Sequence, residues 1–179
     1  MLWLALIIII FILVKNSTTP KMIITDFNYS KYAGLVREAE SGNDYTIENS
    51  IGALGAYQFM PRTLNSLKEM FDLPEWKPKE NFLGSPSLQD LYFEKLVSSD
   101  MEALKNSGIE NYLGVIVSGS KNPKYKNITA PANWYGFLGG SHISGAGNVK
   151  KFFLFGLNPD DGHTSLSDYV AYFSDKGVS

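Results

Sequence analysis

An unbroken apolar run at the start of the chain constrains its fold most, because no water-soluble domain can leave such a run exposed. Leu2 to Val14 reads LWLALIIIIFILV, and as a helix it would cover roughly 20 Å of the ~30 Å core of a bilayer. That length is typical of the apolar part of a signal peptide, but no basic residue precedes the run and no small-residue cleavage site follows it. A buried core helix is the other alternative, although the run has no polar face. We expect an uncleaved N-terminal membrane-anchor helix over residues 1–18, lengthened by snorkelling of Lys15.

The remaining residues divide into a short polar tether, 19–28, and one domain, 29–179, of ordinary size. Apolar residues at helical spacing predict several amphipathic helices. Glycine-rich stretches at 52–55 and 139–147 predict breaks between them. The pattern favours a mostly α-helical α+β domain with a small β element. Four helix starts are predicted from capping residues and a first-turn proline, at Ser30, Pro61, Ser87 and Ser165.

Composition excludes several classes of function. The chain has no cysteine and only two histidines, so disulfides, thiolate metal sites and a histidine-rich metal centre are excluded. We expect no metal and no organic cofactor. Sixteen basic residues stand against 18 acidic ones, without a long basic run, which argues against nucleic acid as a partner.

Glu40 has the most unusual setting of any carboxylate in the sequence. It closes the first predicted helix at the edge of the apolar stripe formed by Tyr32 and Val36, and Gly42 follows where a left-handed, helix-ending residue is expected. Apolar neighbours and the negative end of a helix both favour the protonated form of a carboxyl, which a general acid needs. A partly exposed side chain at a fraying helix end is the alternative. Glu38 points to the opposite face and is predicted to be a surface charge.

Glu40 also begins a longer sequence motif. The pair Glu40-Ser41 is followed by ten residues and then by the segment Gly52-Ala53-Leu54-Gly55-Ala56-Tyr57-Gln58-Phe59-Met60-Pro61-Arg62-Thr63. This combination resembles the signature of lytic transglycosylases of the soluble, goose-lysozyme-like family, in which Glu-Ser and a loop precede Gly-Ala-x-Gly and Gln-x-Met-Pro-x-Thr. The similarity covers about residues 31–173, and the part after Gly139 is similar to small phage-borne and secretion-associated members. The resemblance implies a lysozyme-like fold.

The resemblance also implies a peptidoglycan-cleaving reaction with one carboxyl. Glu40 would protonate the oxygen of the MurNAc-GlcNAc β-1,4 bond and then accept the proton of the sugar's own 6-hydroxyl, which leaves a 1,6-anhydromuramic end. A hydrolytic muramidase would instead need a second carboxylate across the groove. Asp44 and Glu48 are the nearest candidates, and we expect both to be solvated loop charges. If either faced Glu40, hydrolysis would be favoured.

Other residues of the motif have expected roles in substrate binding. Gly52 and Gly55 would allow a positive φ or a close approach of backbone to sugar. Ser41 would orient the Glu40 carboxyl or cap the helix. Gln58 requires a hydrogen-bond partner if it is buried, either backbone near the helix or an N-acetyl group.

Aromatic residues supply further candidates for sugar contact. Tyr57 and Phe59 would alternate sides in an extended segment, so that one packs inward and the other lines the groove. Family members usually carry an Ala-Tyr-Asn-Ala-Gly-like segment, and alignment on Gly139 puts Gly136 where its tyrosine would stand. Tyr135 and Phe137, with Trp134, are expected to form a stacking wall or to join the core. His142 and His163 are expected in loops, with His142 within possible reach of the site.

The expected location follows from the substrate. Lys15 and Lys21 would place the domain in the cytoplasm by the positive-inside rule, whereas peptidoglycan lies outside the inner membrane. A virion membrane removes the conflict, so we expect local wall opening during phage entry; an inner membrane with the domain facing the periplasm is the alternative. Expected partners are peptidoglycan glycan strands, a lipid membrane and other virion or secretion-complex proteins. A structural or wall-binding virion protein without turnover is the hypothesis from another class.

Overall fold

The computed structural model describes residues 27–179, which form an α+β fold that is about 58% helical. A two-stranded antiparallel sheet, with Val117 opposite Ala130, is the small β element. The predicted fold class is confirmed at this level. In chain order the elements are α2 (Tyr29–Ser41), α3 (Pro61–Phe71), α4 (Lys79–Leu83), α5 (Pro86–Asn106), the 3-10 helix η1 (Ile109–Tyr112), β1 (Ile116–Ser118), β2 (Thr129–Pro131), α6 (Trp134–Ser144), α7 (Ala146–Phe155) and α8 (Leu166–Val178).

Two of the four predicted helix starts are confirmed and two are wrong. A proline at the first position opens α3, and a capping box opens α8. The start at Ser30 is wrong, because Asn28 caps α2 by accepting a hydrogen bond from the backbone amide three residues later at 2.9 Å. The start at Ser87 is also wrong. Ser85 caps α5, since Pro86 already has the fixed φ of a first helical residue.

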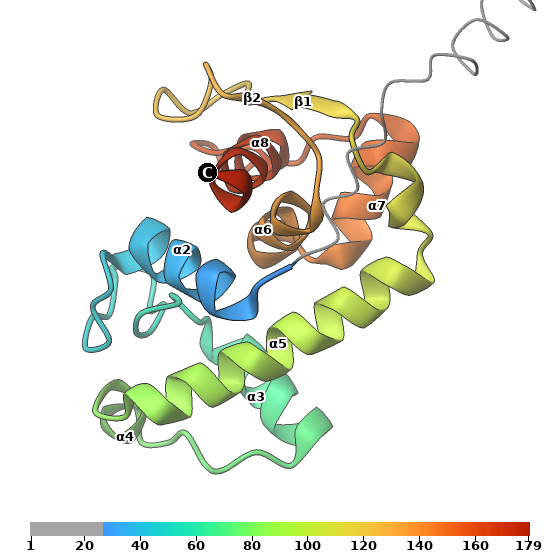
Figure 1. Cartoon of the computed structure of the whole chain (residues 1–179). Coiled ribbons are helices and arrows are strands. Elements are labelled where there is room, and N and C mark those ends of the chain that lie inside the picture. The colour runs from blue at the N-terminus through green and yellow to red at the C-terminus, as the bar shows by residue number, and fades with distance from the viewer. Residues whose placement is uncertain (1–26) are drawn as a thin grey trace, which may run out of the picture.

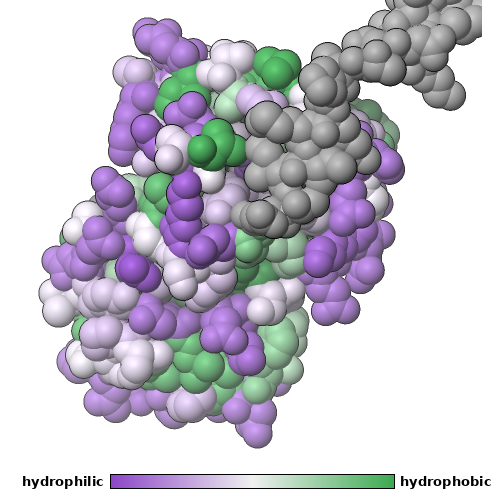
Figure 2. Space-filling view, in the orientation of Figure 1, coloured by the Kyte–Doolittle hydropathy of each residue, from purple (hydrophilic) through white to green (hydrophobic). Residues whose placement is uncertain are grey.

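The helices pack around one aromatic core. Figure 1 shows α6, α7 and α8 beside the small sheet in one part of the molecule, and α2, α3 and α4 in the other, with the long α5 running across both. The ring of Phe93 on α5 stacks on Tyr57 at 3.9 Å between centroids and on Tyr32 of α2 at 5.8 Å. These stacks join α2, the loop after it and α5. On the face shown in Figure 2, hydrophilic residues cover most of the described surface and hydrophobic ones form smaller areas.

The glycine-rich stretch at 139–147 holds the predicted break only in its last part. The break lies at Gly145, between α6 and α7, whereas α6 continues through Gly139 and Gly140 and ends at Ser144. The glycines allow α6 to lie very close to α8: a Cβ on Gly136 would lie 2.0 Å from the Ser174 hydroxyl oxygen, and one on Gly139 would lie 2.3 Å from the Phe173 ring. Close packing between two helices therefore outweighs the low helix propensity of glycine.

The predicted anchor, residues 1–18, and most of the tether lie outside the described residues. No helix within residues 27–179 is long and apolar enough to cross a membrane. The last two tether residues already belong to the packed domain. The ring of Phe27 lies 5.2 Å from that of Tyr135, and the Asn28 amide donates to the Tyr135 hydroxyl at 3.0 Å.

Candidate functional site

Glu40 lies in the last turn of α2, where the sequence placed it. The helix ends at Gly42, which has the left-handed φ of 65° and donates its amide to the Glu38 carbonyl at 3.3 Å. The Glu40 side chain is 18% exposed. Glu38 is exposed, as predicted. The carboxyl of Glu40 is therefore mostly enclosed but still reaches the surface, which is what a general acid that meets a large substrate requires.

Two side chains from distant parts of the sequence approach the same oxygen of Glu40. The Tyr169 hydroxyl, on α8, donates a hydrogen bond to Oε1 at 2.8 Å. The His142 Nε2 atom, on α6, lies 3.7 Å from the same oxygen, within ion-pair distance. Burial strongly raises the pKa of Tyr169, and the negative charge of Glu40 raises it further. The phenol therefore stays protonated and acts as a donor.

Sequence reasoning missed Tyr169, which entered only as part of the apolar stripe of the last helix. It expected His142 in a loop within reach of the site. The side chain does reach Glu40, but the loop placement is wrong, because His142 lies on α6 and is 11% exposed. Position 136 is a glycine, and the tyrosine hydroxyl that reaches Glu40 comes from α8. The available signal was a hydroxyl on the otherwise apolar face of α8, which needs a partner when it is buried. His163 is exposed in a loop, as predicted.

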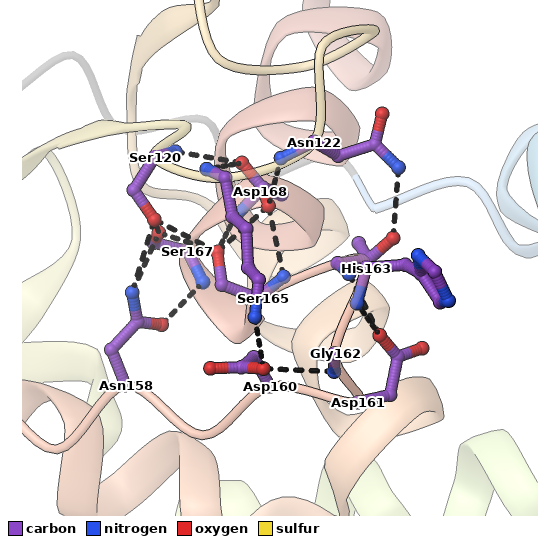
Figure 3. A network of polar contacts seen from close by, with 12 residues as sticks. Ser120, Asn122, Asn158, Asp160, Asp161, Gly162, His163, Ser165, Ser167 and Asp168 are labelled. Atoms are coloured by element: carbon purple, nitrogen blue, oxygen red, sulfur yellow. Dashed lines mark hydrogen bonds and ion pairs between the residues drawn. The ribbon is translucent and has the colours of Figure 1, made fainter.

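A buried polar network fixes the start of α8 and hence the position of Tyr169. The Asp168 carboxylate accepts hydrogen bonds from the backbone amides of Ser120, Asn122 and Ser165 at 2.7 to 3.0 Å, as Figure 3 shows. Burial would raise the pKa of Asp168, but these hydrogen bonds outweigh it and hold the pKa below its usual range. The network ties the loop after β1 to the first turn of α8. Tyr169 directly follows Asp168 in this helix.

The loop between α2 and α3 has the conformation that its glycines predict. Gly52 and Gly55 have φ of 82° and 70°. A Cβ on Gly55 would lie 2.0 Å from Oε1 of Gln89, so the close approach at this position is to a protein side chain. Gln89 is completely buried, accepts from the Ala56 amide at 2.8 Å and donates to the Tyr45 carbonyl at 2.8 Å. The loop is therefore built on α5.

Ser41 and Gln58 bond to backbone within this region. The Ser41 hydroxyl donates to the Ala56 carbonyl at 3.0 Å, which attaches the end of α2 to the loop. Gln58 has a φ of 49° and donates from Nε2 to the Gly55 carbonyl at 2.9 Å. Of the two expected partners of Gln58, backbone or an N-acetyl group, the structure shows a backbone carbonyl of the same loop.

Three predicted sugar-binding aromatics are buried, and this part of the prediction is corrected. Tyr57, Tyr135 and Phe137 are 0%, 2% and 0% exposed. Tyr57 and Phe59 do not alternate, because the left-handed turn at Gln58 reverses the chain and places both rings in the core. Tyr135 and Phe137 are enclosed because α6 is surrounded by other elements along most of its length. For Tyr135 and Phe137, the core position is the alternative that the sequence left open.

Neither Asp44 nor Glu48, the two candidates for a second carboxylate, pairs with Glu40. Asp44 accepts hydrogen bonds from the amide and the hydroxyl of Thr46, both at 2.7 Å. Glu48 pairs with Lys79 at 2.6 Å. Both are exposed, as predicted, and each carboxylate is engaged away from Glu40.

Two surface hollows lie away from these residues. One has a volume of about 320 Å³ between the end of α6 and the loop before α8; the other, of about 290 Å³, lies between α5 and α7. Neither is lined by Glu40 or by residues 52–58, so neither is the groove that the sequence predicted beside this loop. Within residues 27–179, no cluster of three or more histidine, aspartate or glutamate side chains is placed to hold a metal ion.

Comparison with known proteins gives no match: no family model, no curated protein and no solved structure is significantly similar to this chain.

Proposed function

We propose that this chain is a peptidoglycan lytic transglycosylase in which Glu40 is the single acid and base. The observation that carries the proposal is the setting of Glu40. It is a mostly enclosed carboxyl at a helix end, with one oxygen bonded by Tyr169, and it belongs to the Glu-Ser motif that precedes Gly-Ala-x-Gly and Gln-x-Met-Pro-x-Thr.

The reaction needs no group beyond this carboxyl and the sugar itself. Protonated Glu40 gives its proton to the glycosidic oxygen as the bond to the muramic carbon breaks. The carboxylate so formed accepts the proton of the 6-hydroxyl, whose oxygen bonds to the same carbon and closes the 1,6-anhydro ring. The proton lost in the first step is recovered in the second, and no water is consumed. The Tyr169 hydroxyl stabilises the carboxylate between the two steps.

Hydrolysis on the same scaffold remains a second candidate only if another carboxylate activates water. The engagement of Asp44 with Thr46 and of Glu48 with Lys79 supports the transglycosylase outcome over hydrolysis. Digestion of purified peptidoglycan by the full-length protein, followed by mass spectrometry, separates the two. Anhydro-ended muropeptides support the proposal, and reducing ends support a muramidase.

The Glu40→Gln variant tests the catalytic role itself. We expect it to lose wall lysis by at least about a hundredfold, because an amide cannot donate the required proton. Its melting temperature should stay close to that of the wild type, since the amide oxygen still accepts from Tyr169. Glu38→Gln, an exposed position on the same helix, is the matched control and should lyse normally. Equal lysis by the Glu40 variant and the wild type would leave only a wall-binding or structural role.

A further inference from the structure

His142 has the most unusual environment of the side chains around Glu40. Its Nε2 atom faces Oε1 of Glu40 at 3.7 Å, the same oxygen that accepts from Tyr169. Its Nδ1 atom is buried and has no hydrogen-bond partner within residues 27–179. The imidazole and the Phe93 ring form a T-shaped pair, with 5.9 Å between centroids and 75° between planes. The ring is therefore packed in place with one nitrogen directed at the carboxyl.

The unpartnered Nδ1 decides which nitrogen carries the proton of the neutral ring. A buried N–H without an acceptor is rarer and less favourable than a buried lone pair. The neutral imidazole therefore carries its proton on Nε2 and presents an N–H to Glu40. Oε1 then accepts a hydrogen bond from Tyr169 of α8 and has an N–H group of α6 at ion-pair distance.

Two acidic side chains interact with His142 from helices packed near α6. Glu40 of α2 lies 3.7 Å from its Nε2 atom, and Asp100 of α5 interacts with its charge. Burial raises the pKa of Asp100, while the Ser141 hydroxyl and the charge of His142 act to lower it. Tyr169 of α8 bonds to the same Glu40 oxygen, and on α7 the charged residues are two exposed lysines, at 150 and 151. Of these groups, Glu40 is the one in direct ion-pair range of the imidazole.

We propose that His142 is a positioning residue that, together with Tyr169, holds Oε1 of Glu40 as an acceptor, so that the acid form carries its proton on Oε2. The catalytic consequence of this inference rests on the proposed function. Oε2 is then the atom that gives the proton to the glycosidic oxygen and accepts a proton from the 6-hydroxyl. In its charged form His142 pairs with the Glu40 carboxylate.

The position of the ring proton can be measured without any enzymatic activity. The chain has two histidines, so NMR of the full-length protein in detergent gives signals from two imidazoles, and His163→Gln identifies which signals belong to His142. We expect the nitrogen chemical shifts of neutral His142 to place its proton on Nε2, because Nδ1 has no acceptor within residues 27–179. Glu38→Gln should leave these shifts unchanged. A proton on Nδ1 of His142 in the wild type would overturn the inference.

Kinetics of wall lysis test the positioning role separately. His142→Gln keeps an N–H donor and should lyse within about threefold of the wild type, whereas His142→Leu has no donor and should lose at least about tenfold in kcat with KM unchanged. Melting temperatures verify that both variants fold, and His163→Leu should be unchanged. Wild-type kcat in His142→Leu would contradict the positioning role.

The two proposals fail in different ways. If wild-type protein does not cleave peptidoglycan, the proposed function is wrong, and NMR still decides whether Nε2 of His142 carries the proton that is directed at Glu40. If lysis depends on Glu40 but His142 carries its proton on Nδ1, the function stands and the inference is wrong.

Discussion

At the residue scale, the proposed chemistry depends on which oxygen of the Glu40 carboxyl already accepts a hydrogen bond. Tyr169 bonds to Oε1 of Glu40, so this oxygen is already an acceptor before any substrate arrives. A donor fixed in advance stabilises the carboxylate as it forms and needs no reorganisation during the reaction. Its protonation is secure, because burial and the charge of Glu40 both raise the pKa of the phenol.

Removal of this hydroxyl gives a prediction at the same scale. Tyr169→Phe should lower the rate of wall lysis by about 10- to 100-fold, since the carboxylate loses its buried donor. The ring contacts with Phe173 and Tyr125 are kept, so unfolding monitored by circular dichroism should change little. Tyr172→Phe, on the same helix, is the control and should lyse normally. Full activity in Tyr169→Phe would show that the hydrogen bond has no catalytic effect.

At the scale of the elements, the site depends on how closely α6 and α8 pack. These helices carry His142 and Tyr169 respectively, and α2 carries the carboxyl that both side chains address. Gly136 and Gly139 remove the side chains that would hold α6 and α8 apart. A shift of either helix would therefore move a donor away from Glu40.

Glycine substitutions on neighbouring helices test this packing. Gly139→Ala should lower the free energy of unfolding by about 1–3 kcal/mol, because its Cβ would overlap the buried Phe173 ring. Gly147→Ala on α7 is the matched control, since a Cβ there meets nothing within 4 Å. It should be neutral or stabilising by up to about 1 kcal/mol. Equal stabilities of the two variants in urea unfolding would contradict the close packing of α6 on α8.

At the scale of the whole molecule, stability should depend on pH through buried carboxylates of opposite behaviour. The folded state holds the pKa of Asp168 below its usual range, whereas it raises the pKa of Asp100, chiefly by burial. Asp168 therefore stabilises the fold above the usual aspartate range, and this stabilisation is lost as the pH falls below about 4. Asp100 stabilises the fold only while it is protonated, and that contribution is lost as the pH rises.

Asparagine substitutions separate these two contributions. Asp168→Asn should cost about 2–4 kcal/mol near pH 7, because an amide cannot accept all the hydrogen bonds that the carboxylate receives. That difference from the wild type should shrink as the pH falls from about 4 towards 2. Asp100→Asn should show the reverse, with its stability relative to the wild type improving as the pH rises above about 4. Parallel curves of unfolding free energy against pH for the three proteins would refute both assignments.

The sequence alone determined the local features of this protein, and only the tertiary structure decided which side chains surround the carboxyl. The end of α2 at Gly42, the positive φ of Gly52 and Gly55, the proline start of α3 and the capping box of α8 all depend on near neighbours in the chain, so their patterns predict them. The sugar-contact roles of Tyr57, Tyr135 and Phe137 were wrong because helical spacing does not say which faces become covered. Tyr169 is 129 residues from Glu40 in the sequence, and it lies there because two glycines let α6 and α8 pack closely and a buried aspartate fixes the start of α8. Contacts of that range come from the packing of whole helices, which a local pattern does not encode.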